Sequence, residues 1–515
     1  MSGPARAPSI PAALAAAVAA NGRDEALVDG DVRLAWPELA DRVRVAGRAF
    51  VAAGLEPGDR VAIWAPNCWE WVVALLGLQS AGGVVVPLNT RYKGDEAAYV
   101  LARSGARLLI TVDGFLGMHP VAALAASETK QPALETIVIA DGPVPDGAIG
   151  WADLVARGGG AAFRPAAVGP DDVCDLMFTS GTTGKPKGVP CTHGATLRAF
   201  GDWAELVGLR AGDRYLVVAP FFHSFGYKAG WLAALLAGAV VLPQPVFDVD
   251  AVLARVARER ITVLPGPPTL YQSLLAHPAR AGADLSTLRL AVTGAAHVPV
   301  ELVRRMSSEL GFATVLTGYG LTETTGVATL CRAGDDAETV ANTSGRAMPG
   351  VEVHIADDGE VLVRGYNVMR GYLDDPDETA RAIDADGWLH TGDIGVMDGR
   401  GYLRITDRKK DMFIVGGFNA YPAEIEGVLA GHPEIAQVAV VGAPDERLGE
   451  VGVAFVVPRP GARPVQEELI AWSRERMANF KVPRRFELVS ALPLNASGKV
   501  LKVELRRWTA ERSRT

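Results

Sequence analysis

Most of the chain alternates between short apolar runs and longer segments with room for a helix. Apolar runs separated by helical segments are typical of parallel strands that are joined through helices. The pattern therefore predicts an α/β fold built in parallel layers. The apolar runs are residues 215–219, 261–264, 288–293 and 314–317, and two of the helical segments are 247–260 and 300–310.

The alternation changes near residue 351. Short strands at 361–364 and 402–406, with glycine turns between them, predict a small antiparallel β unit that closes the large domain. Beyond Asp411 the pattern predicts a compact α+β unit. Its expected strands are 412–415, 438–441 and 453–457, and its expected helices begin at 422 and cover 465–478. The predicted domains are residues 1–409, with several subdomains, and residues 410–515.

Length and composition exclude several classes of protein. A chain of 515 residues is too long for one compact core, and a net charge of −8 does not favour nucleic acid or an anionic membrane as partner. The longest apolar stretch, 72–88, is interrupted by Gln79-Ser80 and by Gly82-Gly83, which favours a core helix and strand over a membrane span. The alanine-rich segment 10–20 predicts a helix rather than a signal peptide.

Four cysteines that lie far apart are typical of thiols in a reducing cytoplasm.

The densest set of polar groups is T-S-G-T-T-G-K-P-K-G at residues 179–188, directly after an apolar strand. Glycines let the backbone bring its N–H groups close to an anion, while hydroxyl and lysine side chains add donors and positive charge. This predicts a phosphate-binding loop. The spacing matches neither the Walker loop nor the Rossmann glycine motif. The residues expected to contact the phosphates are Thr179, Ser180, Gly181, Thr182, Thr183, Gly184 and Lys187.

The loop resembles the nucleotide loop of the adenylate-forming superfamily, which includes acyl-CoA synthetases, firefly luciferase and the adenylation domains of peptide synthetases. Five further segments resemble the other motifs of that family and stand in the same order. They are residues 318–323, 389–393, 407–411, 416–426 and 493–499. Together the six motifs cover nearly the whole chain.

The resemblance implies a ligase that works in two steps. A carboxylate attacks the α-phosphate of ATP, and the thiol of coenzyme A then attacks the acyl-adenylate. By the same resemblance, Glu323 binds Mg²⁺, a cation that prefers oxygen ligands. Tyr319 stacks on adenine, Thr322 contacts the α-phosphate, and Asp393 and Arg408 hold the ribose. Gly294, Ala295 and Gly320 complete the predicted ATP site.

The resemblance also identifies the catalytic set as Lys499, Thr183, Glu323 and His223. Lys499 is expected to neutralise charge where the carboxylate and the α-phosphate meet. Its loop carries Asn495 where many family members have threonine. Lys410 takes the position of a hinge that lets a mobile C-terminal lid rotate between the two half-reactions. Gly416 and Gly417 are expected to leave room for the pantetheine arm.

The segment 221–228 is expected to bind the acid, with Phe222, His223 and Tyr227 as contacts and His223 beside the carboxylate. No aspartate lies between residues 221 and 231, which argues against an amino acid as substrate. Aromatic residues opposite small residues near 294–296 suit a bulky apolar acid. Lys228 is expected at the surface; contact with a ketone or carboxylate of the substrate is the alternative.

Four segments, some of which lie outside the shared motifs, resemble the actinobacterial ligases that activate a steroid-derived bicyclic indanedione propionate (HIP). They are residues 221–230, 263–280, 321–323 and 384–395. HIP is therefore the expected acid, and a medium-chain, alicyclic or aryl acid is the alternative. Loading of a carrier protein and a regulatory nucleotide-binding role are further alternatives. The sequence leaves a monomer and a homodimer open.

Overall fold

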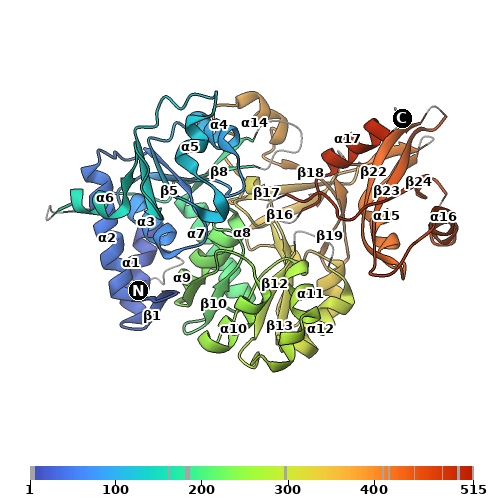
Figure 1. The fold of residues 1–515 in the computed structure, drawn as a ribbon, viewed down its shortest axis with the longest axis horizontal. Coiled ribbons are helices and arrows are strands. Elements are labelled where there is room, and N and C mark those ends of the chain that lie inside the picture. Colours follow the sequence, from blue (N-terminus) through green and yellow to red (C-terminus); the bar gives the residue numbers. More distant parts are fainter. Residues whose placement is uncertain are drawn as a thin grey trace. The chain divides into compact units, whose positions relative to one another are not determined.

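The computed structural model describes residues 6–159, 163–179, 186–294, 298–408, 411–415, 418–445, 447–477, 479–495 and 499–512. These residues form two compact units. The first contains the chain up to Gly294 together with Val298–Glu352 and Arg364–Gly387, and the second contains Val353–Val363 and the chain from Trp388 onward. Figure 1 labels the elements of both.

A seven-stranded sheet in the first unit carries the predicted phosphate loop. Its strand order is β7-β6-β5-β3-β4-β8-β9, and every pairing is parallel except that of β8 with β9. The strands are β3 (Arg60–Trp64), β4 (Val84–Pro87), β5 (Leu108–Val112), β6 (Thr136–Asp141), β7 (Ile149–Gly150), β8 (Val173–Phe178) and β9 (Gly188–Thr192).

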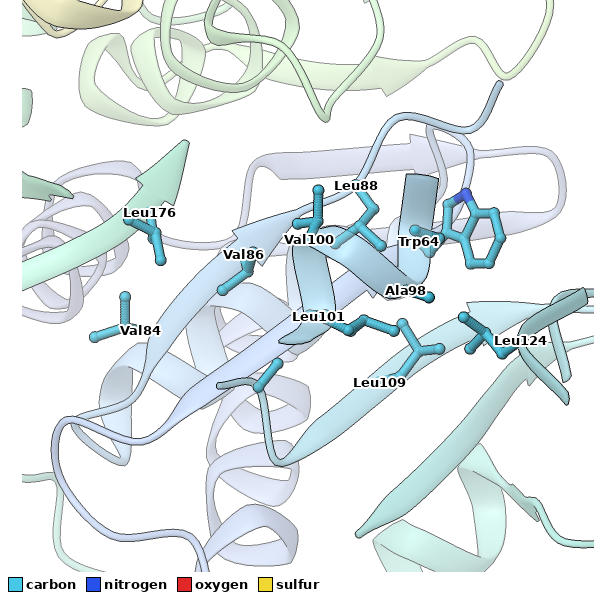
Figure 2. Close-up of a cluster of buried hydrophobic side chains, with 13 residues drawn as sticks. Trp64, Val84, Val86, Leu88, Ala98, Val100, Leu101, Leu109, Leu124 and Leu176 are labelled. Atoms are coloured by element: carbon cyan, nitrogen blue, oxygen red, sulfur yellow. The ribbon is translucent and has the colours of Figure 1, made fainter. Parts of the chain in front are cut away.

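Both faces of this sheet are buried because its strands are apolar at successive positions. Figure 2 shows one face, where Trp64, Val86 and Leu109 pack against Leu101 and Leu124 from two helices. The neighbours of these strand residues in sequence are also buried, so the opposite face is covered as well. Parallel strands joined through helices require this double burial. Burying each such leucine or valine contributes roughly 1.5–3 kcal/mol.

Two smaller sheets complete the strands of the first unit. One has the order β10-β11-β1-β2 and the other β12-β13-β14-β15. Residue Val263 bridges to Tyr215 and to Leu290, so the strand predicted at 261–264 is a single bridging residue between the two sheets. The strands are β1 (Glu25–Asp29), β2 (Val32–Ala35), β10 (Arg214–Val217), β11 (Val240–Pro243), β12 (Leu290–Thr293), β13 (Thr314–Tyr319), β14 (Thr329–Leu330) and β15 (Arg346–Ala347).

The helices of the first unit agree closely with the predicted segments. The expected helix at 300–310 is α12 (Val300–Leu310), the segment 247–260 holds α10 (Val249–Glu259), and the alanine-rich N-terminal segment is α1 (Ile10–Asn21). The apolar stretch 72–88 is divided between α3 and β4, as predicted. The other helices are α2 (Trp36–Ala52), α3 (Trp69–Ser80), α4 (Gly94–Ser104), η2 (Phe115–Gly117), α5 (Pro120–Ala125), α6 (Trp151–Arg157), α7 (His193–Val207), α8 (Ser224–Gly226), η3 (Tyr227–Leu232), α9 (Ala233–Ala237), α11 (Pro268–Ala276), η4 (Pro278–Gly282), η5 (Thr322–Thr324), α13 (Ala337–Asn342) and α14 (Pro376–Ala382).

The second unit contains two antiparallel sheets. The first sheet has the order β16-β17-β18-β19, and the second the order β21-β20-β23-β22, with β24 parallel to β23. The elements are β16 (Val351–Ile355), β17 (Glu360–Gly365), β18 (Leu389–Met397), β19 (Leu403–Arg408), β20 (Phe413–Val415), β21 (Phe418–Ala420), α15 (Pro422–Leu429), β22 (Ile435–Asp445), β23 (Gly449–Pro458), α16 (Gln466–Arg474), β24 (Arg485–Leu488) and α17 (Lys502–Arg512).

Alternation along β22 and β23 divides the C-terminal core between the two faces of the sheet. Val440 and Val456 pack with Ile425 of α15, whereas Val441 and Phe455 pack with Leu505 of α17. Successive residues of a strand point to opposite faces, so two apolar neighbours in sequence require a helix on each face. The predicted helix 465–478 is shorter than expected and ends at Arg474.

The fold class is the predicted one: parallel α/β layers, a small antiparallel β unit and an α+β C-terminal region. The small β unit, which we expected to close the large domain, instead forms one compact unit with the residues that follow it. The boundary at residues 409 and 410 stays a prediction about which part of the chain moves. No helix in the described part of the chain is long and apolar enough to cross a membrane.

Candidate functional site

The predicted phosphate loop is closed at its base by the antiparallel pair β8 and β9. Phe178 pairs with Gly188, and beyond this pair Thr179 N donates to Lys187 O at 2.9 Å. Lys187 N in turn donates to Thr179 Oγ1 at 3.3 Å. These contacts hold the two ends of the loop together. The predicted phosphate contacts Ser180, Gly181, Thr182, Thr183 and Gly184 lie outside the described residues.

The side chain of Lys187 is already paired with an acid. Its ammonium contacts Glu378 of α14 and lies 4.8 Å from the centre of the Tyr372 ring. Hydrogen bonds from Lys187 and Arg381 lower the pKa of Glu378, so this carboxylate stays ionised. A polyphosphate that binds Lys187 therefore competes with Glu378 for the ammonium.

Tyr372 connects this lysine to the residue expected to hold Mg²⁺. Its hydroxyl donates to Glu323 Oε1 at 2.9 Å, and Met369 N donates to the Glu323 carbonyl at 2.8 Å. Burial and the neighbouring Glu323 carboxylate both raise the pKa of Tyr372, so the phenol keeps the proton that it donates. The segment 369–378 thus positions both Lys187 and Glu323.

Sequence analysis missed Tyr372 and Glu378. Their signal was the segment Y-L-D-D-P-D-E at 372–378, an aromatic residue followed by acids and a helix start at Pro376. Residues of this kind are also common in ordinary helix caps. Only their contacts with Lys187 and Glu323 in the structure distinguish Tyr372 and Glu378 from the residues of an ordinary helix cap.

The chemistry of Glu323 fits a magnesium ion that is bound mainly by its substrate. Among the residues with defined positions, no group of three or more His, Cys, Asp or Glu side chains could hold a metal. Mg²⁺ commonly takes one or two protein carboxylates and completes its shell with substrate phosphates and water. One carboxylate beside a phosphate loop suits that arrangement.

Two of the predicted ATP-site residues, Gly294 and Tyr319, lie at the ends of two neighbouring parallel strands. β12 pairs with β13 from Leu290↔Thr314 to Thr293↔Thr317, so Gly294 and Tyr319 follow the same edge of the sheet. Ligands of α/β proteins bind at this carboxyl edge. The buried hydroxyl of Thr293 has no hydrogen-bond partner in the structure. Ala295 lies outside the described residues.

Gly320 is required by the close approach of two backbone segments. A Cβ at this position would collide with Gly326 O and with Val327 Cα. The turn places Thr322 at the start of η5, directly before Glu323. The two predicted phosphate-site residues, Thr322 and Glu323, therefore follow a chain reversal that a larger side chain would prevent.

His223 lies at the start of a short irregular helical segment and is exposed. Its Nδ1 accepts a hydrogen bond from Phe225 N at 3.2 Å, which leaves the proton of the neutral ring on Nε2. Desolvation by the surrounding protein lowers the pKa of His223, although part of its side chain remains accessible. A neutral His223 can donate from Nε2 to a carboxylate. Phe222 beside it is half-buried.

The aromatic residues expected to line the acid pocket form a closed cluster. Tyr227 stacks on Trp231 with ring centres 5.2 Å apart, and Trp71 lies 5.3 Å from Phe221 and 5.7 Å from Tyr227. All four rings are fully buried. Contact of Tyr227 with the acid stays a prediction, and it requires this cluster to open.

Lys228 is not at the surface, and that expectation was wrong. Its side chain is fully buried and its Nζ lies 3.0 Å from Asp175 Oδ1 on β8. Sequence analysis did not consider Asp175, because a single aspartate inside an apolar strand gives no indication of its partner.

In the second unit, Asp393 lies on β18 and is almost fully buried. Its backbone partner across the sheet is Arg408 on β19, so the two residues predicted to hold the ribose occupy one register position. Glu360 on β17 supports the preceding residues: its carboxylate accepts from Gly392 N at 2.9 Å and lies 3.2 Å from His390 Nδ1. Sequence analysis missed Glu360.

Lys499 is exposed and follows a turn that Asn495 closes. Lys499 N donates to Asn495 Oδ1 at 2.8 Å, and Asn495 N donates to Lys499 O at 2.8 Å. The side-chain amide that departs from the family pattern thus fixes the backbone at the lysine. Residues Lys410, Gly416 and Gly417 lie outside the described part of the chain.

Comparison with known proteins agrees with this arrangement. Residues 14–373 match the AMP-binding enzyme family, and residues 424–499 match the AMP-binding enzyme C-terminal domain. The chain belongs to the AMP-binding enzyme family. This confirms the adenylate-forming family that the motifs indicated, and it confirms that the protein is an enzyme of that family.

Two curated relatives of this chain are ligases that share one name with each other. The chain is 55% identical, over 97% of its length and 98% of the relative, to the 3-[(3aS,4S,7aS)-7a-methyl-1,5-dioxo-octahydro-1H-inden-4-yl]propanoyl:CoA ligase of Mycobacterium tuberculosis. It is 52% identical to the ligase of that name from Rhodococcus jostii, over 96% of the chain and 98% of the relative.

Solved structures of the family have the same fold. The anthranilate CoA ligase AuaEII, in complex with anthranoyl-AMP, has a TM-score of 0.88 and 28% identity over 98% of this chain and 97% of its own. ATP-bound MatB from Rhodopseudomonas palustris has a TM-score of 0.85 and 31% identity over 94% of this chain and 96% of its own. These likenesses confirm the predicted fold class.

Proposed function

We propose that the protein is an ATP-dependent acyl-CoA ligase that activates the bicyclic indanedione propionate HIP through an acyl-adenylate. The observation that carries this proposal is the identity of 55% and 52% to two ligases named for this acyl group, over nearly the full length of the chain. Substrate-binding segments as well as shared nucleotide motifs contribute to such long matches.

In the proposed first half-reaction, the phosphate loop and Lys187 bind the β- and γ-phosphates. Glu323 provides the protein ligand for Mg²⁺, and Tyr372 holds the Glu323 carboxylate in place through its 2.9 Å hydrogen bond. Thr322 and Thr183 donate to phosphate oxygens. The neutral ring of His223 orients the acid by donating from Nε2, and Lys499 neutralises charge as the carboxylate approaches the α-phosphate.

In the proposed second half-reaction, the thiol of CoA attacks the acyl carbon and AMP leaves. Asp393 and Arg408 keep the ribose of the adenylate bound, which holds the intermediate until the thiol arrives. Gly416 and Gly417 leave space for the pantetheine arm, and Lys410 is the proposed hinge for the accompanying domain rotation.

The alternative substrates are medium-chain, alicyclic or aryl acids. The specific observation for an aryl acid is 41% identity to a feruloyl-CoA synthase from Amycolatopsis, over 93% of this chain. The higher identity to the two HIP-type ligases favours HIP.

Pyrophosphate release and thioester formation with ATP, Mg²⁺ and CoA test the proposal directly. The acids to be compared are HIP, cyclohexanepropionate, octanoate and benzoate. The Lys499→Ala variant is the control, because any pyrophosphate release that it still shows does not come from catalysis at this site. We expect the highest kcat/KM with HIP. A higher kcat/KM with octanoate or benzoate would keep the reaction class and refute the substrate.

We further propose a cytoplasmic location, where ATP and CoA are available and thiols stay reduced.

Light scattering of the purified protein distinguishes the homodimer from the monomer, and the site as described needs no residue from a second copy.

A further inference from the structure

A buried ion pair connects two parts of the proposed active site. Asp175 lies on β8, the strand that ends directly before the phosphate loop, and Lys228 lies in η3, which begins just after His223. Lys228 Nζ and Asp175 Oδ1 are 3.0 Å apart, and both side chains are excluded from solvent. None of the roles proposed above uses either residue.

The ammonium of Lys228 keeps its charge in these surroundings. Burial alone disfavours the charged ammonium, but the neighbouring Asp175 carboxylate outweighs this effect and raises the pKa of Lys228. Cys174 Sγ donates to Asp175 Oδ2 at 3.1 Å, and the ammonium lies 5.9 Å from the centre of the Tyr227 ring. The charges are therefore compensated within the core.

Stability gives no sufficient reason for such a pair. Moving two charges out of water costs free energy that their attraction only partly offsets, and apolar residues of similar shape often serve as well or better. A buried pair of this kind does fix geometry, because breaking it leaves an uncompensated charge in the core.

The segment that Lys228 holds has an unusual backbone. η3 is a π-helical turn, and Gly230 within it departs from helical geometry with φ −85° and ψ −106°. Such turns are rare and often lie at functional sites. Gly226 packs so closely on Ala219 O and Pro220 O that a Cβ would collide with both. The ion pair adds a directional contact to this close packing.

We propose that Asp175 and Lys228 are positioning residues for adenylate formation. Their ion pair holds the turn that bears His223 at a fixed place relative to the strand that bears the phosphate loop. The acid carboxylate and the α-phosphate then meet in a reactive geometry. This inference rests on the proposed ligase function but not on HIP as the acid.

The main test is a double variant, Asp175→Leu with Lys228→Met, which removes both charges and keeps similar side-chain volumes. Kinetics use the acid that gives the wild-type enzyme its fastest pyrophosphate release, so an error in the substrate does not affect the result. We expect a thermal unfolding midpoint near that of the wild type. We expect kcat for adenylation to fall on the order of tenfold or more, because small misplacements of reacting groups are costly. Thioester formation from supplied acyl-adenylate should be unchanged.

A matched control separates positioning from general destabilisation. Leu109→Ala creates a cavity in the core shown in Figure 2, away from the ion pair, and should lower the unfolding midpoint while leaving kcat for adenylation unchanged. A double variant that adenylates at the wild-type rate would overturn the proposal. So would equal losses in both half-reactions.

A second variant covers the case in which the double variant does not fold. Asp175→Glu keeps both charges but lengthens the acid by one methylene group, which forces the pair to shift. We expect a folded protein with reduced kcat for adenylation and little change in KM for ATP. If neither variant folds, or if Asp175→Glu has the wild-type kcat, the pair serves only folding and the proposal fails.

Discussion

Single residues of this chain acquire their chemistry from their environment. Lys187 and Lys499 both belong to motifs, yet Lys187 is held by Glu378 whereas Lys499 is exposed beside its own turn. Lys228, outside any recognised motif, is fully buried against Asp175. One residue type is thus found in an ion pair at the end of a loop, exposed at the surface and buried in the core.

Replacing Lys499 by alanine should abolish adenylate formation and leave thioester formation from supplied acyl-adenylate largely intact. The reason is that its charge is needed only where the carboxylate meets the α-phosphate. Separate assays of the two half-reactions check this. Loss of both half-reactions to the same degree would assign Lys499 a structural role instead.

His193 should make folding stability depend on pH. It is fully buried, its Nδ1 accepts from Ile10 N at 3.2 Å, and burial lowers its pKa from 6.5 to about 4. Between these values the unfolded chain binds a proton that the folded protein does not, so stability falls as pH decreases. The loss on going from pH 6.5 to 4 is about 3 kcal/mol.

The variant His193→Asn isolates this contribution. Its amide oxygen can accept from Ile10 N but does not titrate. Denaturant unfolding at several pH values should show a smaller loss of stability in the variant between pH 6.5 and 4. Parallel curves for the two proteins would show that other groups cause the acid sensitivity.

At the scale of elements, the site is built where loops meet the ends of strands. β8 and β9 carry the predicted phosphate loop, and β12 and β13 carry predicted ATP-site residues at their carboxyl ends. In the segment 369–378, Tyr372 contacts Glu323 and Glu378 contacts Lys187. The strands hold the ends of the loops in place. Contacts between side chains of different loops hold the site residues at their distances from one another.

Replacing Tyr372 by phenylalanine should lower kcat for adenylation and raise the Mg²⁺ concentration needed for half-maximal rate. A hydrogen bond to a charged group contributes about 1.5–3 kcal/mol, which sets an upper bound on the order of a hundredfold loss. Pyrophosphate release over a Mg²⁺ titration measures both effects. Tyr366→Phe is the control, since the Tyr366 hydroxyl lies 3.5 Å from Asp202, which is not a predicted site residue. Equal behaviour of the two variants would refute the role of Tyr372.

At the scale of the whole molecule, the predicted site residues are divided between the two compact units. Lys187, His223 and Glu323 belong to the first unit, whereas Asp393 and Lys499 belong to the second. An enzyme with two half-reactions can use a change between units to bring different residues to one intermediate. Lys410 is assigned as the hinge residue only from the motif in which it lies.

Replacing Lys410 by proline should spare adenylation and block the thioester step. Proline fixes φ and removes a backbone donor, which restricts the rotation that the second step requires. Stopped assays with CoA added after adenylation measure each step. Normal CoA turnover in this variant would place the hinge elsewhere.

The sequence by itself determined the family, the order of the elements and the motif residues. The apolar stretch 72–88 indicated the buried strand β4, because burial on both faces of a sheet requires apolar residues at successive positions. The phosphate loop and the turn at Gly320 were recognisable because their chemistry lies within a few consecutive residues.

Only the tertiary structure decided which distant residues meet. Asp175 with Lys228, Tyr372 with Glu323 and Glu360 with Gly392 are separated by 53, 49 and 32 residues in the chain. Local sequence gave no sign of these pairs, because an isolated lysine or carboxylate is ordinarily solvated at the surface. Their burial follows from the packing of whole elements, which brings each charge to its partner.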